Sequence, residues 1–401
     1  MSQNRMVSGA RSGRGRVLRF VAAGGAAVLA VALAAVSPGS AGAAGRTTYP
    51  LAQNLRPRFS TDGGASVLAT TRTVPHWHGS FVDGLNGQTY GYNMVGTDPA
   101  SGGSTAINAE IIPLDVSFAA NGGYSLRGEP VASWAAKSPI FAPTPMPTGE
   151  TAQYLDSVMR SEFNQIGSGY HVQLTAGVLP TQTIKVPSDR GALYYGWDGT
   201  TVIGLVNEEW FAAQLQSVLA SSHLDPATLP IFVSNDVFVY PKSVANCCNL
   251  GFHGAAHLTG LGAGSAHGNG DQDVQTYAWA SWITSPGVFG VPGLTDVSSL
   301  SHEVSEWGHD PFADNYVNPW AIPGAAQYGC TNLLESGDPL VGVEFGVGPT
   351  AAGTFNQDPA SGPQWHLQDE AFLWWFARNQ TQASNGAYSY LGTFTSGAPT
   401  C

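Results

Sequence analysis

Charge is scarce in this chain of 401 residues, and positive charge is the scarcer kind. Asp, Glu, Lys and Arg make up 11% of the sequence, against roughly 25% in an average globular protein. The 16 Lys and Arg residues are outnumbered by 28 Asp and Glu, which gives a formal net charge of −12. A chain with this balance lacks the basic surface that a polyanion requires, so nucleic acid is excluded as a partner.

Several sequence signatures are also missing. There is no Gly-x-Ser-x-Gly motif of a serine hydrolase and no glycine-rich phosphate loop that ends in Gly-Lys. No Cys-x-x-Cys pair occurs, which disfavours a zinc site made of cysteines. Beyond residue 36 no apolar run is long enough to span a bilayer, so we expect no membrane segment in the mature protein.

The N-terminus has the features of a secretory signal peptide in the required order. Five Arg residues precede an apolar run over residues 20–36, and small residues follow at 40–44. We expect cleavage after Ala43 and a secreted, extracellular protein; the alternative is an uncleaved anchor, for which a run of 17 residues is short. Removal of residues 1–43 leaves 11 basic against 28 acidic residues, a formal charge of −17.

The mature chain is apolar enough to bury a large core. Hydrophobic residues make up 43% of the sequence, which also contains 50 Gly and 26 Pro. We expect one large domain over residues 44–401, or two packed lobes at 44–137 and 150–401.

Residue patterns predict both strands and helices. Aromatic and β-branched residues predict strands over 73–81, 88–95, 107–118, 193–197, 201–205, 231–240 and 274–283. Helical spacing predicts helices over 151–165, 208–221, 296–309 and 365–378. A Gly-rich loop is expected over 251–271. The predicted fold class is α+β, with a β-rich N-terminal part and a disulfide-linked C-terminal part that contains a zincin-like helix.

Four cysteines allow three disulfide pairings: Cys247, Cys248, Cys330 and Cys401. A bridge between neighbouring cysteines closes a strained ring. We therefore expect Cys247 and Cys248 each to pair with one of the two distant cysteines.

The helix predicted over 296–309 contains the motif His302-Glu-Val-Ser-Glu306. At about 100° per residue, His302 and Glu306 share one face, and the opposite face is apolar: Val297, Leu300, Val304 and Trp307. Two ligands one turn apart can hold one ion, as in the helix of zinc proteases, here with Glu in place of the second His. We predict that His302 and Glu306 bind Zn²⁺ or another divalent metal, and that Glu303 is the general base that activates water there.

A third ligand must come from another segment. Glu335, in Glu335-Ser-Gly-Asp338, follows His302 by 33 residues and resembles the later Glu that completes a thermolysin-like site. It is ranked first. Asp338 is ranked second and Asp310 third. His309 and His253 are further possible ligands, and His253 could approach the helix if the disulfides draw the segments together.

Two further groups of histidines are weaker candidates. His76-Trp-His78 resembles a multicopper oxidase segment, but the other histidine pairs of those enzymes are missing, so we interpret it as two histidines exposed on a strand. His267 lies near Asp271 and Asp273 without the spacing of a calcium loop.

Several segments, which together span most of the mature chain, resemble a group of secreted bacterial proteins without assigned function. These segments are residues 90–99, 247–254, 302–306 with 310–311, 335–338 and 368–372. The segment 247–254 also resembles, more weakly, the phosphate-induced or exordium-like proteins of plants, which lack the His-Glu-x-x-Glu helix. The resemblance implies a shared fold and a shared set of motifs, and it does not imply any particular activity.

Two functions of different class fit these features. The first is a secreted metal-dependent hydrolase, a zinc peptidase acting on a peptide or cell-wall polymer. The alternative is a non-catalytic protein of the cell surface or wall whose aromatic residues bind polysaccharide. Bound metal would distinguish them.

Overall fold

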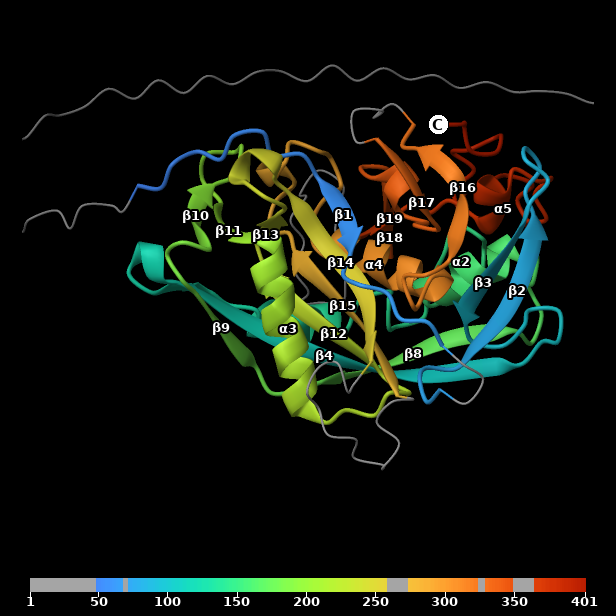
Figure 1. Ribbon diagram of the computed structural model, residues 1–401, viewed down its shortest axis with the longest axis horizontal. Helices are drawn as coiled ribbons and strands as arrows, with labels where there is room; N and C mark the ends of the chain where they lie inside the picture. Colours follow the sequence, from blue (N-terminus) through green and yellow to red (C-terminus); the bar gives the residue numbers. More distant parts are fainter. Residues whose placement is uncertain (1–47, 68–70, 258–272, 324–328, 349–363) are drawn as a thin grey trace, which may run out of the picture. The chain divides into compact units, whose positions relative to one another are not determined.

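The computed structural model describes residues 48–67, 71–257, 273–323, 329–348 and 364–401, and Thr48–Cys401 form one compact unit. The expected signal peptide lies outside the described residues, as do His267 and Asp271. Among the helices of the described ranges, none is long and apolar enough to cross a membrane. The fold is mixed α+β and is built around one large curved sheet (Figure 1).

That sheet has eleven strands, and its main path runs β10-β11-β13-β14-β15-β12-β4-β5. Strand β1 pairs with β14, and β8 and β9 both pair with β4. The strands are Arg58–Thr61 (β1), Ser104–Phe118 (β4), Tyr124–Leu126 (β5), His171–Val178 (β8), Gln182–Val186 (β9), Gly191–Tyr195 (β10), Val202–Asn207 (β11), Leu229–Asn235 (β12), Val237–Tyr240 (β13), Asn249–His257 (β14) and Val274–Trp282 (β15).

The central strands are covered on both faces, which explains their nearly continuous apolar sequences. Every residue of β15 is buried. Because side chains alternate along a strand, Phe232 and Trp279 pack in the cluster of α3 (Glu208–Ser222), whereas Ile231 and Ala280 pack in the cluster of α2 (Tyr154–Glu162) and α4 (Ser298–His309). Helices α3 and α4 therefore lie on opposite faces of the sheet (Figure 1).

Smaller elements surround this framework. They are the hairpin of β2 (His76–Val82) and β3 (Thr89–Val95), α1 (Glu129–Ala135), β6 (Thr144–Pro145) with β7 (Thr151–Ala152), β16 (Tyr316–Ala321) with β17 (Cys330–Leu333), β18 (Glu344–Val347) with β19 (Trp365–Gln368), and α5 (Leu373–Ala377). Short 3-10 helices cover Ala119–Asn121, Val244–Asn246, Pro286–Val288 and Asp338–Leu340. Strand β19 and the turn at Asp338 both lie next to α4.

Two predicted elements of the C-terminal half are wrong. The helix expected over 365–378 is split into β19 and α5, because Trp365–Gln368 pair with Glu344–Val347 and are wholly buried. The Gly-rich loop expected over 251–271 is wrong for residues 251–257, which belong to β14 and pair with β15, and its remaining residues lie outside the described ranges.

The strand expected over 231–240 is two strands, separated at Asp236. This residue has a φ of 51°, in the left-handed region that a strand does not adopt. Its Oδ1 accepts a hydrogen bond from the Thr284 backbone N–H at 2.8 Å. Strand β12 pairs with β4 and β15, whereas β13 pairs with β11 and β14, so the break moves the chain to another place in the sheet.

Asp236→Asn is expected to stabilise the protein at pH 8 and to have little effect at pH 4. Burial raises the pKa of Asp236 to about 7, so the folded state keeps a proton that the unfolded state releases near pH 4. Folding stability is therefore lost as pH rises from about 4 to 7, by a few kcal/mol. Asn keeps the acceptor oxygen and tolerates positive φ. Thermal melting across this pH range measures the effect, and a gain of equal size at both pH values would contradict it.

The disulfides link Cys247 to Cys248 and Cys330 to Cys401, so the expected pairing is wrong. Cys330 and Cys401 are both exposed, and their bridge ties the C-terminus to β17. Cys247 and Cys248 are buried in a different cluster with Leu55 and Leu250, where neither distant cysteine reaches them. The peptide bond between these neighbours is cis.

Candidate metal centre

Helix α4 carries the central side chains of the candidate site. Val297, Leu300, Val304 and Trp307 are buried, as the helical spacing predicts. The opposite face is buried as well: His302, Glu303 and Glu306 have no exposed surface. Other segments of the chain therefore cover this face of the helix.

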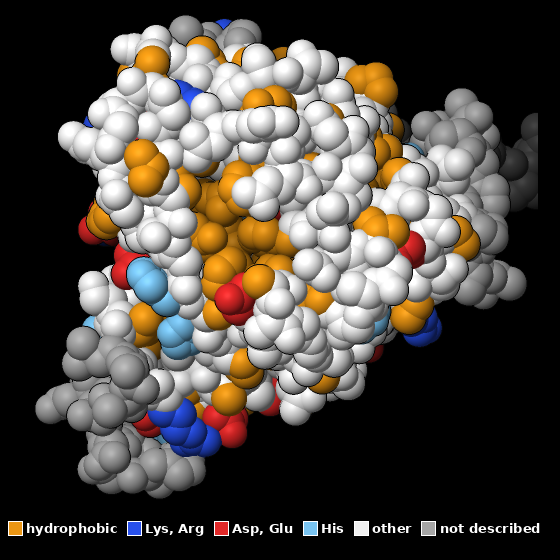
Figure 2. Space-filling model, turned by 90° about the vertical axis from the view of Figure 1, so that its right-hand side faces the viewer, with side chains coloured by type: hydrophobic (Ala, Val, Ile, Leu, Met, Phe, Trp, Pro, Cys, Tyr) orange, Lys and Arg blue, Asp and Glu red, His pale blue; other side chains and the backbone are white. Residues whose placement is uncertain are grey.

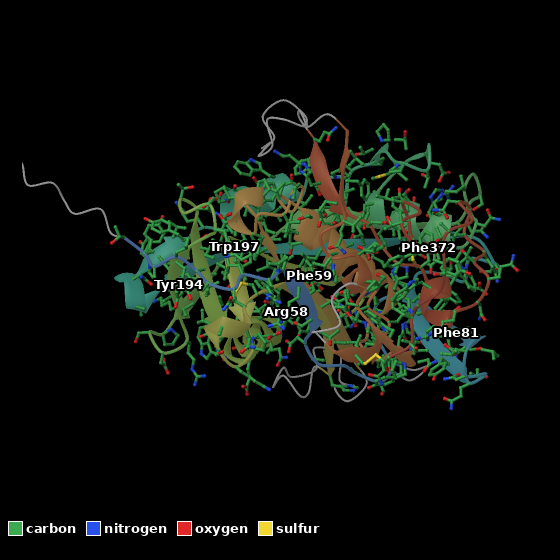
Figure 3. All side chains as sticks on the ribbon, turned by 90° about the horizontal axis from the view of Figure 1, so that it is seen from above. Arg58, Phe59, Phe81, Tyr194, Trp197 and Phe372 are labelled. Carbon is green, nitrogen blue, oxygen red and sulfur yellow. A yellow bond between two sulfur atoms is a disulfide. The ribbon has the colours of Figure 1, made fainter. Side chains whose placement is uncertain are left out.

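Three segments cover the polar face of α4. Strand β14 contributes His253, and α4 is tied to this strand by the Ser299 hydroxyl, which donates to the Leu250 carbonyl at 2.9 Å. Strand β1, which pairs with β14, places Phe59 against His302 with the ring centroids 3.4 Å apart. Figure 3 labels Phe59 on β1, next to Arg58. The third segment is the turn over residues 335–338.

Two groups of ligand atoms meet around Glu306. Among the described residues, the groups of three or more side chains whose donor atoms lie within 4.8 Å of one another are His253, Glu306 and Glu335, and His302, Glu306 and Asp338. His302 Nε2 lies 3.0 Å from Glu306 Oε1 and 3.9 Å from Asp338 Oδ1. His253 Nδ1 lies 3.6 Å from Glu306 Oε2. This buried arrangement could bind a metal ion.

The two downstream carboxylates fall in different groups. Glu335, the third ligand ranked first from the sequence, groups with His253. Asp338, ranked second, groups with His302. The predicted set of His302, Glu306 and Glu335 is therefore divided, and Glu306 is the residue that both groups share.

Several buried polar atoms of this centre have no hydrogen-bond partner in the described structure: His253 Nε2, His302 Nε2, Glu303 Oε1, Glu306 Oε2 and Glu335 Oε1. His302 Nε2 and Glu306 Oε1 are close enough for a hydrogen bond but are not aligned for one. Burying a polar atom without a partner costs about 1–3 kcal/mol, and more for a charged group. A cation held among these atoms would remove that cost.

Gln368 orients the ring of His302. Its Oε1 lies 3.1 Å from His302 Nδ1, and its amide nitrogen donates to the Gly337 carbonyl at 2.7 Å. Because the carbonyl fixes the amide, Oε1 accepts the Nδ1 proton, and Nε2 is the ring nitrogen of His302 that faces Glu306 and Asp338. One ring nitrogen held by an outer hydrogen bond and the other directed at carboxylates is the arrangement of a metal-ligating histidine.

The electrostatics of the centre are dominated by carboxylates. Burial raises the pKa of Glu335 and of Asp338 well above the ordinary value, and the charge of Glu306 raises both further. Burial also disfavours ionised Glu306, but His302 and His253 outweigh it and lower its pKa. For His253, burial lowers the pKa, and Glu335, Glu303 and Glu306 together raise it well above normal. Two histidines cannot balance this many buried carboxylates.

Glu303 occupies the space next to β14. Its Oε2 lies 3.3 Å from His253 Nδ1, and its Oε1 is unpartnered among the described residues. A Cβ on Gly251 would lie 2.6 Å from Glu303 Oε1, so glycine at this position makes room for the carboxylate. Burial is the main cause of the raised pKa of Glu303.

His309 and Asp310 do not join either group. His309 Nδ1 lies 2.7 Å from the Ser305 carbonyl, and Nε2 lies 2.7 Å from Glu162 Oε2, so both nitrogens are used. Asp310 accepts backbone N–H bonds from Asp314 and Asn315 and stabilises the turn after α4.

The histidines His76 and His78 lie on β2, where the first is half-buried and the second exposed. Asp273, the described member of the weak calcium candidate, is buried directly before β15 and pairs with Arg72 through a backbone bridge. Neither position belongs to the groups around Glu306. A cavity of about 420 Å³ next to α2 also lies elsewhere, since its lining includes Ser161, Ser384 and Tyr390 and no member of those groups.

Sequence reasoning missed Gln368, Phe59 and Gly337 as parts of the centre. Gln368 stands in a segment that carried the family resemblance, but no local pattern assigns its amide to a histidine 66 residues away. Phe59 has no sequence signal beyond its apolar character. Gly337 stands within the acidic turn, where a glycine between two candidate ligands was a usable signal.

Gly337→Ala is expected to weaken metal binding by about 10- to 100-fold, the usual effect of disturbing the support of a ligand. Gly337 has ordinary helical backbone angles, so alanine adds only its Cβ, which would lie 2.4 Å from His302 Nδ1. Titration calorimetry with Zn²⁺ measures the change. Gly177→Ala is the matched control, because an added Cβ there meets no atom within 4 Å. Equal affinities for the two variants would contradict the prediction.

The chain matches no protein-family model, no curated protein and no solved structure. The function of the centre must therefore be inferred from its own side chains.

Proposed function

We propose that this protein is an exported metal-dependent hydrolase, with a peptide bond as the target of the reaction. One observation carries the proposal: nitrogen and oxygen atoms of His302, His253, Glu306 and Glu335 that have no partner among the described residues converge in a buried site that has an excess of carboxylates. Burying such groups is costly unless a cation pairs them. We further propose that α4 with the turn at residues 335–338 forms a zincin-like C-terminal part, as in the secreted bacterial group that the sequence resembles.

Each side chain has a chemical task in this proposal. His302 and Glu306, one helical turn apart, hold the ion. The ion, when bound, supplies a Lewis acid that activates water and polarises a carbonyl group. Glu303 accepts the proton from water at Oε1, which has no hydrogen-bond partner among the described residues, and returns it to the leaving amine, as a general base and then a general acid.

The ligand types favour zinc without excluding other divalent metals. Imidazole nitrogen and carboxylate oxygen both bind Zn²⁺, whereas a rising share of carboxylates also suits Mn²⁺. Substrate would approach from the side of Asp338, since 16% of its side chain is exposed and His302 and Glu306 are fully enclosed.

The proposal is tested with purified mature protein that has been treated with a chelator and then dialysed. Cleavage of a mixed peptide library, followed by mass spectrometry, is expected only after Zn²⁺ or Mn²⁺ is restored. Mature protein that binds neither ion at micromolar concentration would contradict the proposal.

A second function is favoured by two observations. The site is closed on most sides, which is typical of a structural metal site. In addition, Figure 2 shows hydrophobic side chains in a hollow of one face. The half-buried rings of Trp77, Phe163 and Trp374 contact one another in series, at centroid distances of 5.8 and 6.2 Å. Such rings suit a non-catalytic protein that binds polysaccharide, and pull-down with insoluble cell-wall polymer, without hydrolysis, would support it.

The proposal also includes export of the protein. We expect the secreted protein to begin near Ala44 and to contain no titratable thiol when it is denatured without reductant, because all four cysteines are paired. Intact mass spectrometry with an alkylating agent tests both statements. Retention of residues 1–43, or alkylation of any cysteine, would contradict them.

A further inference from the structure

Glu306 belongs to both groups of ligand atoms, and its two oxygens face different histidines. Oε1 lies 3.0 Å from His302 Nε2, whereas Oε2 lies 3.6 Å from His253 Nδ1. We propose that the centre binds two divalent metal ions bridged by the Glu306 carboxylate. One ion lies with His302 and Asp338, and the other with His253 and Glu335. This inference rests on the proposed function, because it concerns the same site.

The distances suit an ion on each side of Glu306. Two ligands that each lie about 2.1 Å from one ion are about 3.0 Å apart at a right angle and about 3.4 Å apart at a tetrahedral angle. The separations of 3.0 Å on the His302 side and 3.6 Å on the His253 side fall close to these values. His302 and Asp338, at 3.9 Å, can also share one ion at a wider angle.

A single ion would leave half of the centre unsatisfied. His253 and His302 do not occur in one group of ligand atoms. A single ion therefore cannot bind both histidines while their side chains stay in place. An ion on the His302 side would leave Glu335 Oε1 buried without a partner in the described structure and His253 Nδ1 facing the carboxylates of Glu303 and Glu306. An ion on the His253 side would leave His302 Nε2 facing two carboxylates.

The number of carboxyl groups is compatible with two ions. Four carboxyl groups surround the two histidines: those of Glu303, Glu306, Glu335 and Asp338. Two divalent cations would allow all four groups to be ionised while buried, whereas with one cation some of them would keep a proton. In two-metal sites the ions lie about 3.5–4 Å apart and stabilise both the attacking and the leaving atoms of a displacement. The two-ion centre is thus an arrangement suited to hydrolysis.

The first test is the number of ions in the wild-type protein. Mature protein is saturated with Mn²⁺, freed of excess metal, and analysed by elemental analysis and electron paramagnetic resonance. We expect two Mn²⁺ per chain and the spectrum of two magnetically coupled ions. One Mn²⁺ per chain at saturation, with the spectrum of an isolated ion, would overturn the two-ion centre and leave a single-ion hydrolase intact. No bound ion would overturn both proposals.

The second test separates the two positions. His253→Ala and His302→Ala should each retain one Mn²⁺ per chain and show the uncoupled spectrum, because each removes a ligand of one ion only. His78→Ala, an exposed histidine on β2, is the matched control and should keep two coupled ions. Circular dichroism of each variant verifies folding. Folded His253→Ala that still binds two coupled ions would overturn the assignment of His253, and loss of all metal from both variants would indicate one shared ion.

Discussion

Glu303→Gln is expected to keep the metal content of the wild type and to lower the rate of hydrolysis by about two to four orders of magnitude. The amide has nearly the same shape as the carboxylate, so it fits the space that Gly251 leaves beside β14. It cannot accept a proton from water. Glu303 is absent from both ligand groups, which is why the ions should remain.

Two variants serve as references for Glu303→Gln. Glu306→Gln should lose metal and activity together, because Glu306 belongs to both groups. Asp314→Asn, in the turn after α4, should change neither. The measurements are metal content per chain and the rate of peptide cleavage. Wild-type activity in Glu303→Gln would exclude Glu303 as the general base, and loss of metal from this variant would place Glu303 among the ligands.

Removal of the metal is expected to lower the melting temperature by on the order of 10 °C. An ion present at about 1,000 times its dissociation constant stabilises the folded state by about 4 kcal/mol, so two ions contribute about 8 kcal/mol. The entropy of unfolding is about 2.1 cal/mol/K per residue, so for the unit Thr48–Cys401 each kcal/mol changes the melting temperature by roughly 1.3 °C. The physical reason is that chelation removes the cations and leaves the carboxyl groups of the centre buried without a partner of opposite charge.

His302→Ala provides the control for this prediction. It should melt at a lower temperature than the wild type in Zn²⁺ and respond less to a chelator. His78→Ala should respond as the wild type does. Scanning calorimetry of the three proteins, with and without chelator, gives the result. Identical melting temperatures of the wild type in the two conditions would show that no ion stabilises the fold.

The strongly periodic elements were predictable from the sequence, whereas their surroundings were not. The apolar side of α4 follows from the 3.6-residue repeat, and Val304 and Trp307 are buried as expected. The burial of its polar side depends on Phe59 and Gln368, which lie more than 60 residues away along the chain. No local pattern specifies that such segments return to one helix.

Pairing of distant segments also explains the errors in the site and the disulfides. His253 was expected near the helix only if disulfides brought it there, yet β14 packs against α4 directly, as the Ser299 to Leu250 bond shows. Glu335 and Asp338 were predicted as candidate ligands, but the sequence could not assign them to different histidines. That division depends on how the turn at residues 335–338 lies against α4, which only the fold determines.

The helix predicted over 365–378 failed for a related reason. Its apolar residues have helical spacing, but Trp365–Gln368 form a strand against Glu344–Val347, and this pairing overrides local preference. Gln368 owes its position beside His302 to that strand.

The most direct test of the account is crystallographic. Crystals of the mature protein grown with Zn²⁺ are measured at energies just above and just below the zinc absorption edge, so that anomalous difference maps locate zinc alone. We predict an anomalous peak about 2.0–2.2 Å from His302 Nε2 and from a Glu306 oxygen, and a second peak beside His253. Maps without a peak in the buried site between α4, β14 and the turn at residues 335–338 would contradict the claim that this protein is built around a metal centre.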